Sequence, residues 1–200
     1  MYLAKNEIFR EILGVHGAII ECGVFLGGGL MTWANFSAIY EPFNHTRRIV
    51  GFDTFSGFSG LSAEDGTRSI DFKQPGGLAT NAHEDVLESI SLYDSNRPIG
   101  HIPRCELVVG DACNTIAAYV EDNPQLVVAM LYLDFDAYEP TKAALEHFLP
   151  RMPKGSLVCF DELYDPMWPG ETQAVHEVLG LAEISINRFP YVSNLSYTRL

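Results

Sequence analysis

The chain has 200 residues, 47% of them hydrophobic and 20% charged, which is enough apolar material for a core and excludes intrinsic disorder of the whole chain. Acidic residues number 26 against 13 basic ones, and the net charge of −13 argues against binding of nucleic acid or of an anionic membrane surface. The apolar stretches are too short for a membrane span, the N-terminus lacks the apolar segment of a signal peptide, and the four cysteines stand far apart. We therefore expect one domain over residues 1–200, acidic and cytoplasmic, with reduced cysteines.

Strand patterns and helix patterns alternate along the chain. Apolar runs that end in polar or glycine-rich turns predict five strands, over residues 18–23, 48–53, 106–111, 126–133 and 155–160. Segments of helical period predict helices over 29–40, 115–120, 139–148 and 171–181, and two short strands near 184–189 and 195–199 close the chain. This alternation predicts an α/β fold, a mostly parallel seven-stranded sheet with helices on both faces, in which the last strands can run antiparallel.

One long segment interrupts the alternation. Residues 54–82 are rich in glycine, serine and acidic residues and directly follow the second predicted strand. Loops of this length are usually lids or binding loops, or are disordered, and ligands of parallel sheets bind where the strands end. We therefore interpret 54–82 as a lid over the acceptor, and its hydroxyl and charged side chains, Arg68 and Lys73 among them, favour a polar acceptor.

Glycines cluster where the first strand meets the first helix. The run from Glu21 to Gly29 reads ECGVFLGGG. It does not match the dinucleotide pattern GxGxxG, because Phe25 and Thr32 fall where glycines are required, and it lacks the lysine of a P-loop. It does match the E/DxGxxxGxG turn of S-adenosylmethionine (SAM) methyltransferases, although a plain tight turn is an alternative.

Two further strand ends carry aspartates. Asp53 ends the second strand, where a carboxylate can accept both ribose hydroxyls, and Asp111 follows the third, where it can receive an adenine amino group. Each aspartate could instead cap the segment that follows it. Because three strand ends carry groups suited to one ligand, we favour SAM binding.

Four carboxylates follow the next two strands. Asp134 and Asp136 end the fourth strand, and Asp161 and Glu162 end the fifth. Gathered at one edge of a parallel sheet, they would repel one another unless a cation or a proton neutralised them. Oxygen donors with no nearby histidine or cysteine favour Mg²⁺ or another hard divalent ion. The alternative is a solvated acidic rim, which we disfavour because both groups end apolar strands.

Several motifs follow one another in an order that resembles a known family. They are Phe52-Asp53-Thr54-Phe55, Gly110-Asp111-Ala112, LDFDAYEPTK over 133–142, Phe160-Asp161-Glu162, and WPGETQA over 168–174. Together they resemble the macrocin O-methyltransferase family, which includes enzymes that methylate deoxysugar hydroxyls of natural products. The resemblance extends from about Ile19 to Ala174.

The resemblance implies a class I SAM-dependent, Mg²⁺-dependent O-methyltransferase with a Rossmann-like fold, acting on a sugar or a glycosylated natural product. On that model Asp134, Asp161 and Glu162 ligate the metal, with Glu162 where a second aspartate is expected, and Asp136 is the base for the hydroxyl proton. The candidate cofactor-binding residues are Glu21, Gly23, Gly27, Gly29, Asp53, Thr54, Phe55, Asp111 and Ala112. We also expect a homo-oligomer. Two alternatives stay open: a catechol-type O-methyltransferase and a non-catalytic SAM-binding domain.

Overall fold

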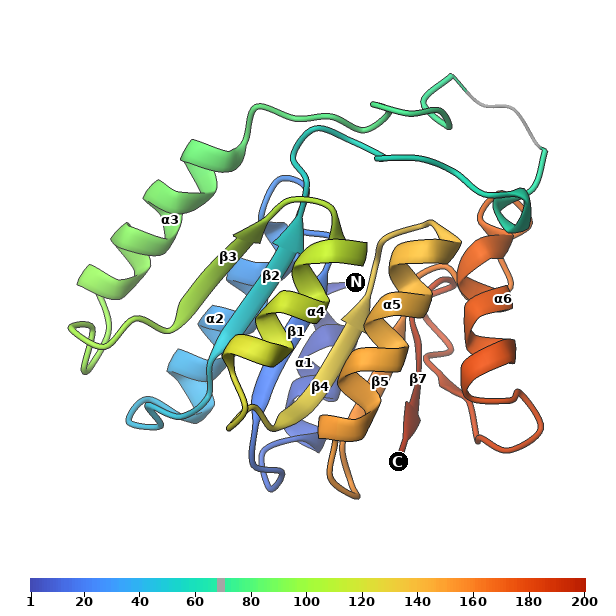
Figure 1. Cartoon of the computed structure of the whole chain (residues 1–200). Helices are drawn as coiled ribbons and strands as arrows, with labels where there is room; N and C mark the ends of the chain where they lie inside the picture. Colours follow the sequence, from blue (N-terminus) through green and yellow to red (C-terminus); the bar gives the residue numbers. More distant parts are fainter. Residues whose placement is uncertain (68–70) are drawn as a thin grey trace.

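A seven-stranded sheet runs through the computed structural model, which describes residues 1–67 and 71–200 (Figure 1). The strands are β1 (Ala18–Cys22), β2 (Ile49–Asp53), β3 (Cys105–Val109), β4 (Val128–Leu133), β5 (Leu157–Phe160), β6 (Asn187–Arg188) and β7 (Ser196–Arg199). Their order is β3-β2-β1-β4-β5-β7-β6, with β1 to β5 parallel and β7 antiparallel to both of its neighbours. The predicted fold is confirmed, including the reversed strand near the C-terminus.

Helices cover both faces of this sheet (Figure 1). They are α1 (Tyr2–Glu11), α2 (Gly28–Tyr40), α3 (His83–Ser95), α4 (Ala112–Asp122), α5 (Tyr138–Phe148) and α6 (Pro169–Val178), with short 3-10 turns η1 (Ala63–Asp65) and η2 (Leu149–Arg151). Successive strand residues face opposite sides. Met130 and Tyr132 of β4 therefore pack with α1 and α2, whereas Leu131 and Leu133 pack with α4, α5 and α6. None of the helices in the described ranges has the length and hydrophobicity that a membrane span requires.

Two of these helices, α1 and α3, are absent from the sequence prediction. In α1 the buried residues Ala4 and Ile8 lie four positions apart, and Ile12 follows at the same spacing just beyond the helix. This spacing places all three on one helical face, which is the signal that the sequence analysis missed. Helix α3 packs on α2, where the Tyr93 hydroxyl donates to the Ala34 carbonyl at 2.6 Å.

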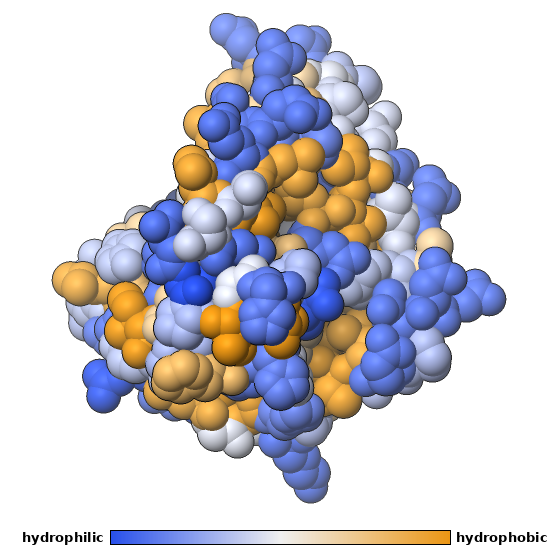
Figure 2. Space-filling model, turned by 90° about the vertical axis from the view of Figure 1, so that its left-hand side faces the viewer, coloured by the Kyte–Doolittle hydropathy of each residue, from blue (hydrophilic) through white to orange (hydrophobic). Residues whose placement is uncertain are grey.

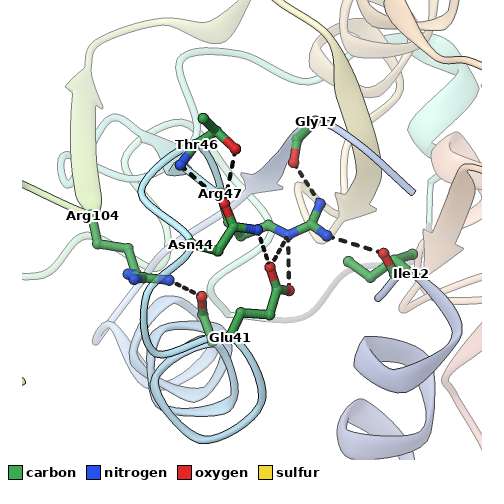
Figure 3. A network of polar contacts seen from close by, with 8 residues as sticks. Ile12, Gly17, Glu41, Asn44, Thr46, Arg47 and Arg104 are labelled. Carbon is green, nitrogen blue, oxygen red and sulfur yellow. Dashed lines mark hydrogen bonds and ion pairs between the residues drawn. The ribbon is translucent and has the colours of Figure 1, made fainter. Parts of the chain in front are cut away.

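A buried polar network joins the chain at the amino ends of the strands (Figure 3). The Arg47 guanidinium, 2% exposed, donates to the carbonyls of Gly17, at 2.5 Å, and Ile12, at 3.0 Å. Its Nε also pairs with Glu41 at 3.1 Å, and Arg104 donates to the hydroxyl of Ser37. The network ties the connection before β1 to the one before β2. It leaves the opposite, carboxyl ends of the strands to build a site.

Candidate active site

A cavity of about 790 Å³ lies along the carboxyl ends of β1 to β4. Its wall combines the glycine turn after β1 with Asp53 and Thr54, residues 110–113, residues 134–137 with 139–140 and, from the lid segment, residues 57–62 with 77–78. Exposed apolar side chains of the turn, Phe25 and Leu26, belong to this wall. The side of the molecule that carries α3 is hollowed, and hydrophobic residues are exposed in the hollow between polar ones (Figure 2). The cavity therefore spans the predicted cofactor turn, the acidic strand end and the lid.

Seven of the nine candidate cofactor residues line this cavity. They are Glu21, Gly23, Gly29, Asp53, Thr54, Asp111 and Ala112. The other two, Gly27 and Phe55, are not among the described residues of its wall. Gly27 adopts a left-handed conformation before α2 and packs on Val86 of α3, while Phe55 is 8% exposed and packs on the His83 ring. Both residues therefore support the turns that line the cavity without lining it themselves.

Two glycines of the turn allow close approaches that a side chain would block. Gly23 has φ +99°, and a Cβ there would lie 2.0 Å from the carbonyl oxygen of Asp134. At Gly29 a Cβ would lie 1.7 Å from Oε1 of Glu21, whose carboxyl sits against the first turn of α2. The glycines thus bring the end of β1 against the end of β4 and admit a carboxyl beneath the turn.

Asp53 holds the glycine turn in place. Its Oδ2 accepts hydrogen bonds from the backbone N–H groups of Val24 and Phe25, both at 2.7 Å, and its Oδ1 accepts from Phe55 N–H at 2.7 Å. A carboxylate has about four acceptor positions, so the half-buried Asp53 keeps capacity for a ligand. The side chain joins the ends of β1 and β2 into one wall of the cavity.

Asp111 caps helix α4. Its Oδ1 accepts the Cys113 backbone N–H at 3.0 Å, the geometry of the capping alternative. The side chain also lies in the cavity wall. Capping and contact with a ligand are compatible, because one carboxylate oxygen suffices for the cap.

Lys5 of α1 lies beneath the cavity and was missed by the sequence analysis. Its Nζ is 4.4 Å from the ring centroid of Tyr132 and 5.2 Å from that of Trp33, and the residue is 7% exposed. Burial raises the pKa of the nearby Glu21 carboxyl to about 8, and the charge of Lys5 offsets part of that rise. Lys5 directly follows Ala4 on the buried side of α1. This neighbourhood is the one feature of the sequence that could have indicated that Lys5 is buried.

The four predicted carboxylates do lie near one another. Burial raises the pKa of Asp134 well above its usual range, and the charges of Asp161 and Asp136 act in the same direction. Burial, followed by the charges of Asp161 and Asp165, raises the pKa of Asp136 to about 7. Burial, followed by the charges of Asp136 and Asp161, raises the pKa of Glu162 to about 8. Asp134, Asp136 and Glu162 therefore favour bound protons when no cation is present.

Neighbouring residues enlarge this acidic group. The Tyr132 hydroxyl donates to Oδ1 of Asp161 at 2.7 Å. Glu171 is fully buried, accepts the Glu162 backbone N–H at 3.1 Å, and has a pKa raised well above its usual range by burial. Glu171 belongs to the WPGETQA motif, but the sequence analysis assigned it no role in the site. Its burial beside the other carboxyls could not be read from the motif.

A preformed metal centre is not found. Within residues 1–67 and 71–200, no three His, Cys, Asp or Glu side chains converge closely enough to hold a metal ion. Of the three expected ligands, only Asp134 lies in the wall of the cavity as described, while Asp161 and Glu162 do not. The donor chemistry still suits a hard cation, because all three supply oxygens, and the buried Oε2 of Glu162 has no hydrogen-bond partner among the described residues.

The strand order, the glycine turn and the acidic strand ends together define a class I SAM-dependent methyltransferase. The chain belongs to the macrocin-O-methyltransferase (TylF) family, whose model matches residues 4–185, and it is a SAM-dependent O-methyltransferase. Comparison with curated proteins gives no match.

Three solved structures illustrate the relationship. The calicheamicin methyltransferase CalS11 is 40% identical, with a TM-score of 0.94 over 99% of this chain and 77% of that one. An apo structure of CalS11, described as a TDP-rhamnose 3′-O-methyltransferase of calicheamicin biosynthesis, is 39% identical, with a TM-score of 0.84 over 99% of this chain and 78% of that one. The O-methyltransferase NovP shares the fold at 17% identity, with a TM-score of 0.71 over 99% of this chain and 78% of that one.

Proposed function

We propose that this enzyme methylates a hydroxyl of a deoxysugar carried by a nucleotide or a glycoside. The observation that carries the proposal is the position of Asp136 in the wall of the same cavity that the glycine turn and residues 57–62 of the lid segment line. Ser59 and Ser62 give this part of the wall hydroxyl groups suited to a sugar. The 40% identity to CalS11, described as acting on TDP-rhamnose, supports the same class of acceptor.

In this proposal Asp136 is the general base. An alcohol is a weak nucleophile, and a carboxylate next to it takes its proton as the bond between oxygen and the methyl carbon forms. SAM, when bound, supplies the methyl group, whose bond to sulfur breaks in the same step. Asp53 and Asp111 would hold the ribose and adenine, and Glu21, which also lines the cavity, would contact another part of SAM. The work of this chain is then to align the hydroxyl with the donor and to remove its proton.

We further propose that Asp134, Asp161 and Glu162 hold Mg²⁺. The cation would offset the mutual repulsion of these carboxylates, and at Asp134 and Glu162 it would replace the protons that their raised pKa values favour. When bound, it would lower the cost of negative charge on the acceptor oxygen. Because the three side chains do not converge in the described structure, binding would require Asp161 and Glu162 to turn toward Asp134.

Incubation of the purified enzyme with labelled SAM and single acceptors tests the proposed function. We expect methyl transfer to TDP-rhamnose or to another TDP-deoxysugar, and none to catechol. Chelator should abolish turnover, and added Mg²⁺ should restore it. Transfer to catechol but to no sugar would contradict the proposed acceptor, and full activity in excess chelator would contradict the metal.

A further inference from the structure

One carboxylate of the lid segment contacts the start of helix α5, next to the active-site cavity. Asp65 ends the short turn η1 and is 1% exposed, although the segment around it is largely exposed. Its Oδ1 accepts the backbone N–H of Tyr138 at 2.7 Å, across a separation of 73 residues. Its Oδ2 accepts the backbone N–H of Ser62 at 2.7 Å and the Ser62 hydroxyl at 3.1 Å. One side chain therefore joins the cavity wall of the lid to the start of α5.

Helix α5 needs a cap that its own sequence does not supply. The residue before the helix is Ala137, which has no side-chain oxygen to accept an N–H group of the first turn. Asp65 supplies that acceptor, and a negative charge at a helix N-terminus is favourable because of the helix dipole. Gly170 of α6 leaves room for the contact, since a Cβ there would lie 2.1 Å from Oδ1 of Asp65 and 2.7 Å from Tyr138 N.

The capped turn follows directly on the proposed base. Asp136 has φ +62°, a left-handed conformation that costs a non-glycine residue free energy and must be held by its surroundings. Tyr138, whose backbone N–H donates a hydrogen bond to Asp65, lies only two residues further along the chain. Holding the Tyr138 backbone therefore limits how far the Asp136 loop can move.

Further contacts hold the same part of the lid segment in place. The Phe58 ring lies 5.4 Å from the ring of Trp168, and Lys73 Nζ lies 5.0 Å from it. Lys73 also donates to the carbonyl oxygens of Asp65 and Met167. These contacts place η1 beside the start of α6 (Figure 1).

We propose that Asp65 is a positioning residue of the reaction. Its carboxylate binds the Tyr138 backbone and Ser62 at the same time, and so fixes the Asp136 loop relative to the part of the lid segment that lines the cavity. This proposal rests on the proposed function, because it takes Asp136 as the base. A displacement of about 1 Å at a reacting group can cost about a hundredfold in rate, so loss of the contact should appear in kcat. Binding of SAM depends on the turns after β1 and β2, so it should change little.

The test compares Asp65→Ala and Asp65→Asn with Asp71→Asn, which removes an exposed charge from the same lid segment. Asp65→Ala should lower kcat for TDP-rhamnose about a hundredfold, with KM for SAM within about threefold, and should abolish protection of the Tyr138 amide from hydrogen exchange. Asp65→Asn keeps an oxygen for that amide, so it should recover most of the rate and the protection. Asp71→Asn should match the wild type in all three measurements.

Two outcomes would overturn the proposal. One is a lower melting temperature for Asp65→Ala with an unchanged kcat, which would make the contact merely structural. The other is unchanged protection of the Tyr138 amide, which would show that Asp65 does not hold the loop. Hydrogen exchange needs no acceptor, so it decides this point even if the wild type methylates none of the sugars, an outcome that would count against the proposed function alone. If Asp65→Ala fails to fold, Gly170→Ala places a methyl group between Asp65 and Tyr138 and should produce the same losses.

Discussion

Asp136 combines a left-handed backbone with a buried carboxyl, and each of these costs free energy. The backbone conformation costs about 1–3 kcal/mol for a non-glycine residue. Burial and the neighbouring carboxylates make its charged form less favourable, as its raised pKa shows. Residues with strained backbones or strongly shifted pKa values are concentrated at functional sites, because the packing that stabilises the strained residue also fixes the orientation of its side chain. This agrees with a role for Asp136 in the proposed chemistry.

Asp136→Asn separates the proposed base from the proposed metal ligand. Asparagine keeps the size of the side chain and tolerates the left-handed conformation, but it cannot take a proton. We expect Asp136→Asn to fold and to bind SAM and Mg²⁺ while methyl transfer falls by about a hundredfold or more, the scale of general-base loss. Asp134→Asn should lose Mg²⁺ affinity together with activity. Methyl-transfer rates of both variants, measured during Mg²⁺ titration, distinguish the two roles. Full recovery of the Asp136→Asn rate at high Mg²⁺ would show that Asp136 is a metal ligand and not the base.

Asp53→Ala tests the cofactor turn. The substitution removes the acceptors of three backbone N–H groups, those of Val24, Phe25 and Phe55, together with the proposed partner of the ribose. A hydrogen bond to a charged group contributes about 1.5–3 kcal/mol, so we expect SAM affinity to fall at least about tenfold. Titration calorimetry with S-adenosylhomocysteine measures the effect. Unchanged affinity would exclude Asp53 from the cofactor site.

At the scale of the elements, a buried ion pair stabilises the connections at the amino ends of the strands, whereas the candidate active site lies at their carboxyl ends. Arg47 and its neighbour Arg48 show the contrast. Arg47 pairs with Glu41 at side-chain exposures of 2% and 8%, whereas Arg48 pairs with Glu106 at 44% and 38%. Solvent screens the second pair but not the first.

This contrast predicts different effects of two adjacent substitutions. Arg47→Met leaves the Glu41 charge buried without its partner and two carbonyls without their donor, so the free energy of unfolding should fall by about 3–5 kcal/mol. Arg48→Met should lower it by only about 0–1 kcal/mol. Urea denaturation of both variants provides the measurement. Equal losses would mean that burial does not set the strength of these pairs.

At the scale of the whole molecule, carboxyl groups buried at one end of the sheet link stability to pH. Folding raises the pKa of Glu21 and Glu162 to about 8 and that of Asp136 to about 7, from ordinary values near 4. Between about pH 4 and 8 the folded protein therefore binds more protons than the unfolded chain. By linkage, the free energy of unfolding must fall as pH rises through this window.

We accordingly expect the metal-free enzyme to be more stable at pH 6 than at pH 8.5. The measurement is urea denaturation at both pH values in the presence of chelator. Glu21→Gln should reduce the difference, because it removes one of the groups that take up a proton on folding. Mg²⁺ should raise the stability more at pH 8.5, where the carboxyls are ionised. A stability that rises with pH would contradict the assignment of these groups as protonated.

Much of the architecture could be predicted from local patterns. The apolar run 126–133 indicated a strand, and β4 is buried along its whole length. The glycines after β1 indicated a tight turn, and the structure adds that Gly23 allows this turn to pack closely against the backbone of Asp134. Helix α1 was missed because its apolar face is short and its first turn carries Lys5. Apolar period and turn chemistry are properties of neighbouring residues, so the sequence displays them directly.

The sequence by itself therefore determined the alternating α/β fold, the glycine turn after β1 and the strand ends that carry the acids. Only the tertiary structure decided that Lys5 lies near Glu21, that Asp65 caps α5 in place of Ala137, and that the expected metal ligands do not converge. Each of these depends on segments far apart in the chain, whose distance is set by the packing of all the helices on the sheet. No local pattern records that distance, because the same residues could face solvent in another arrangement of the same elements.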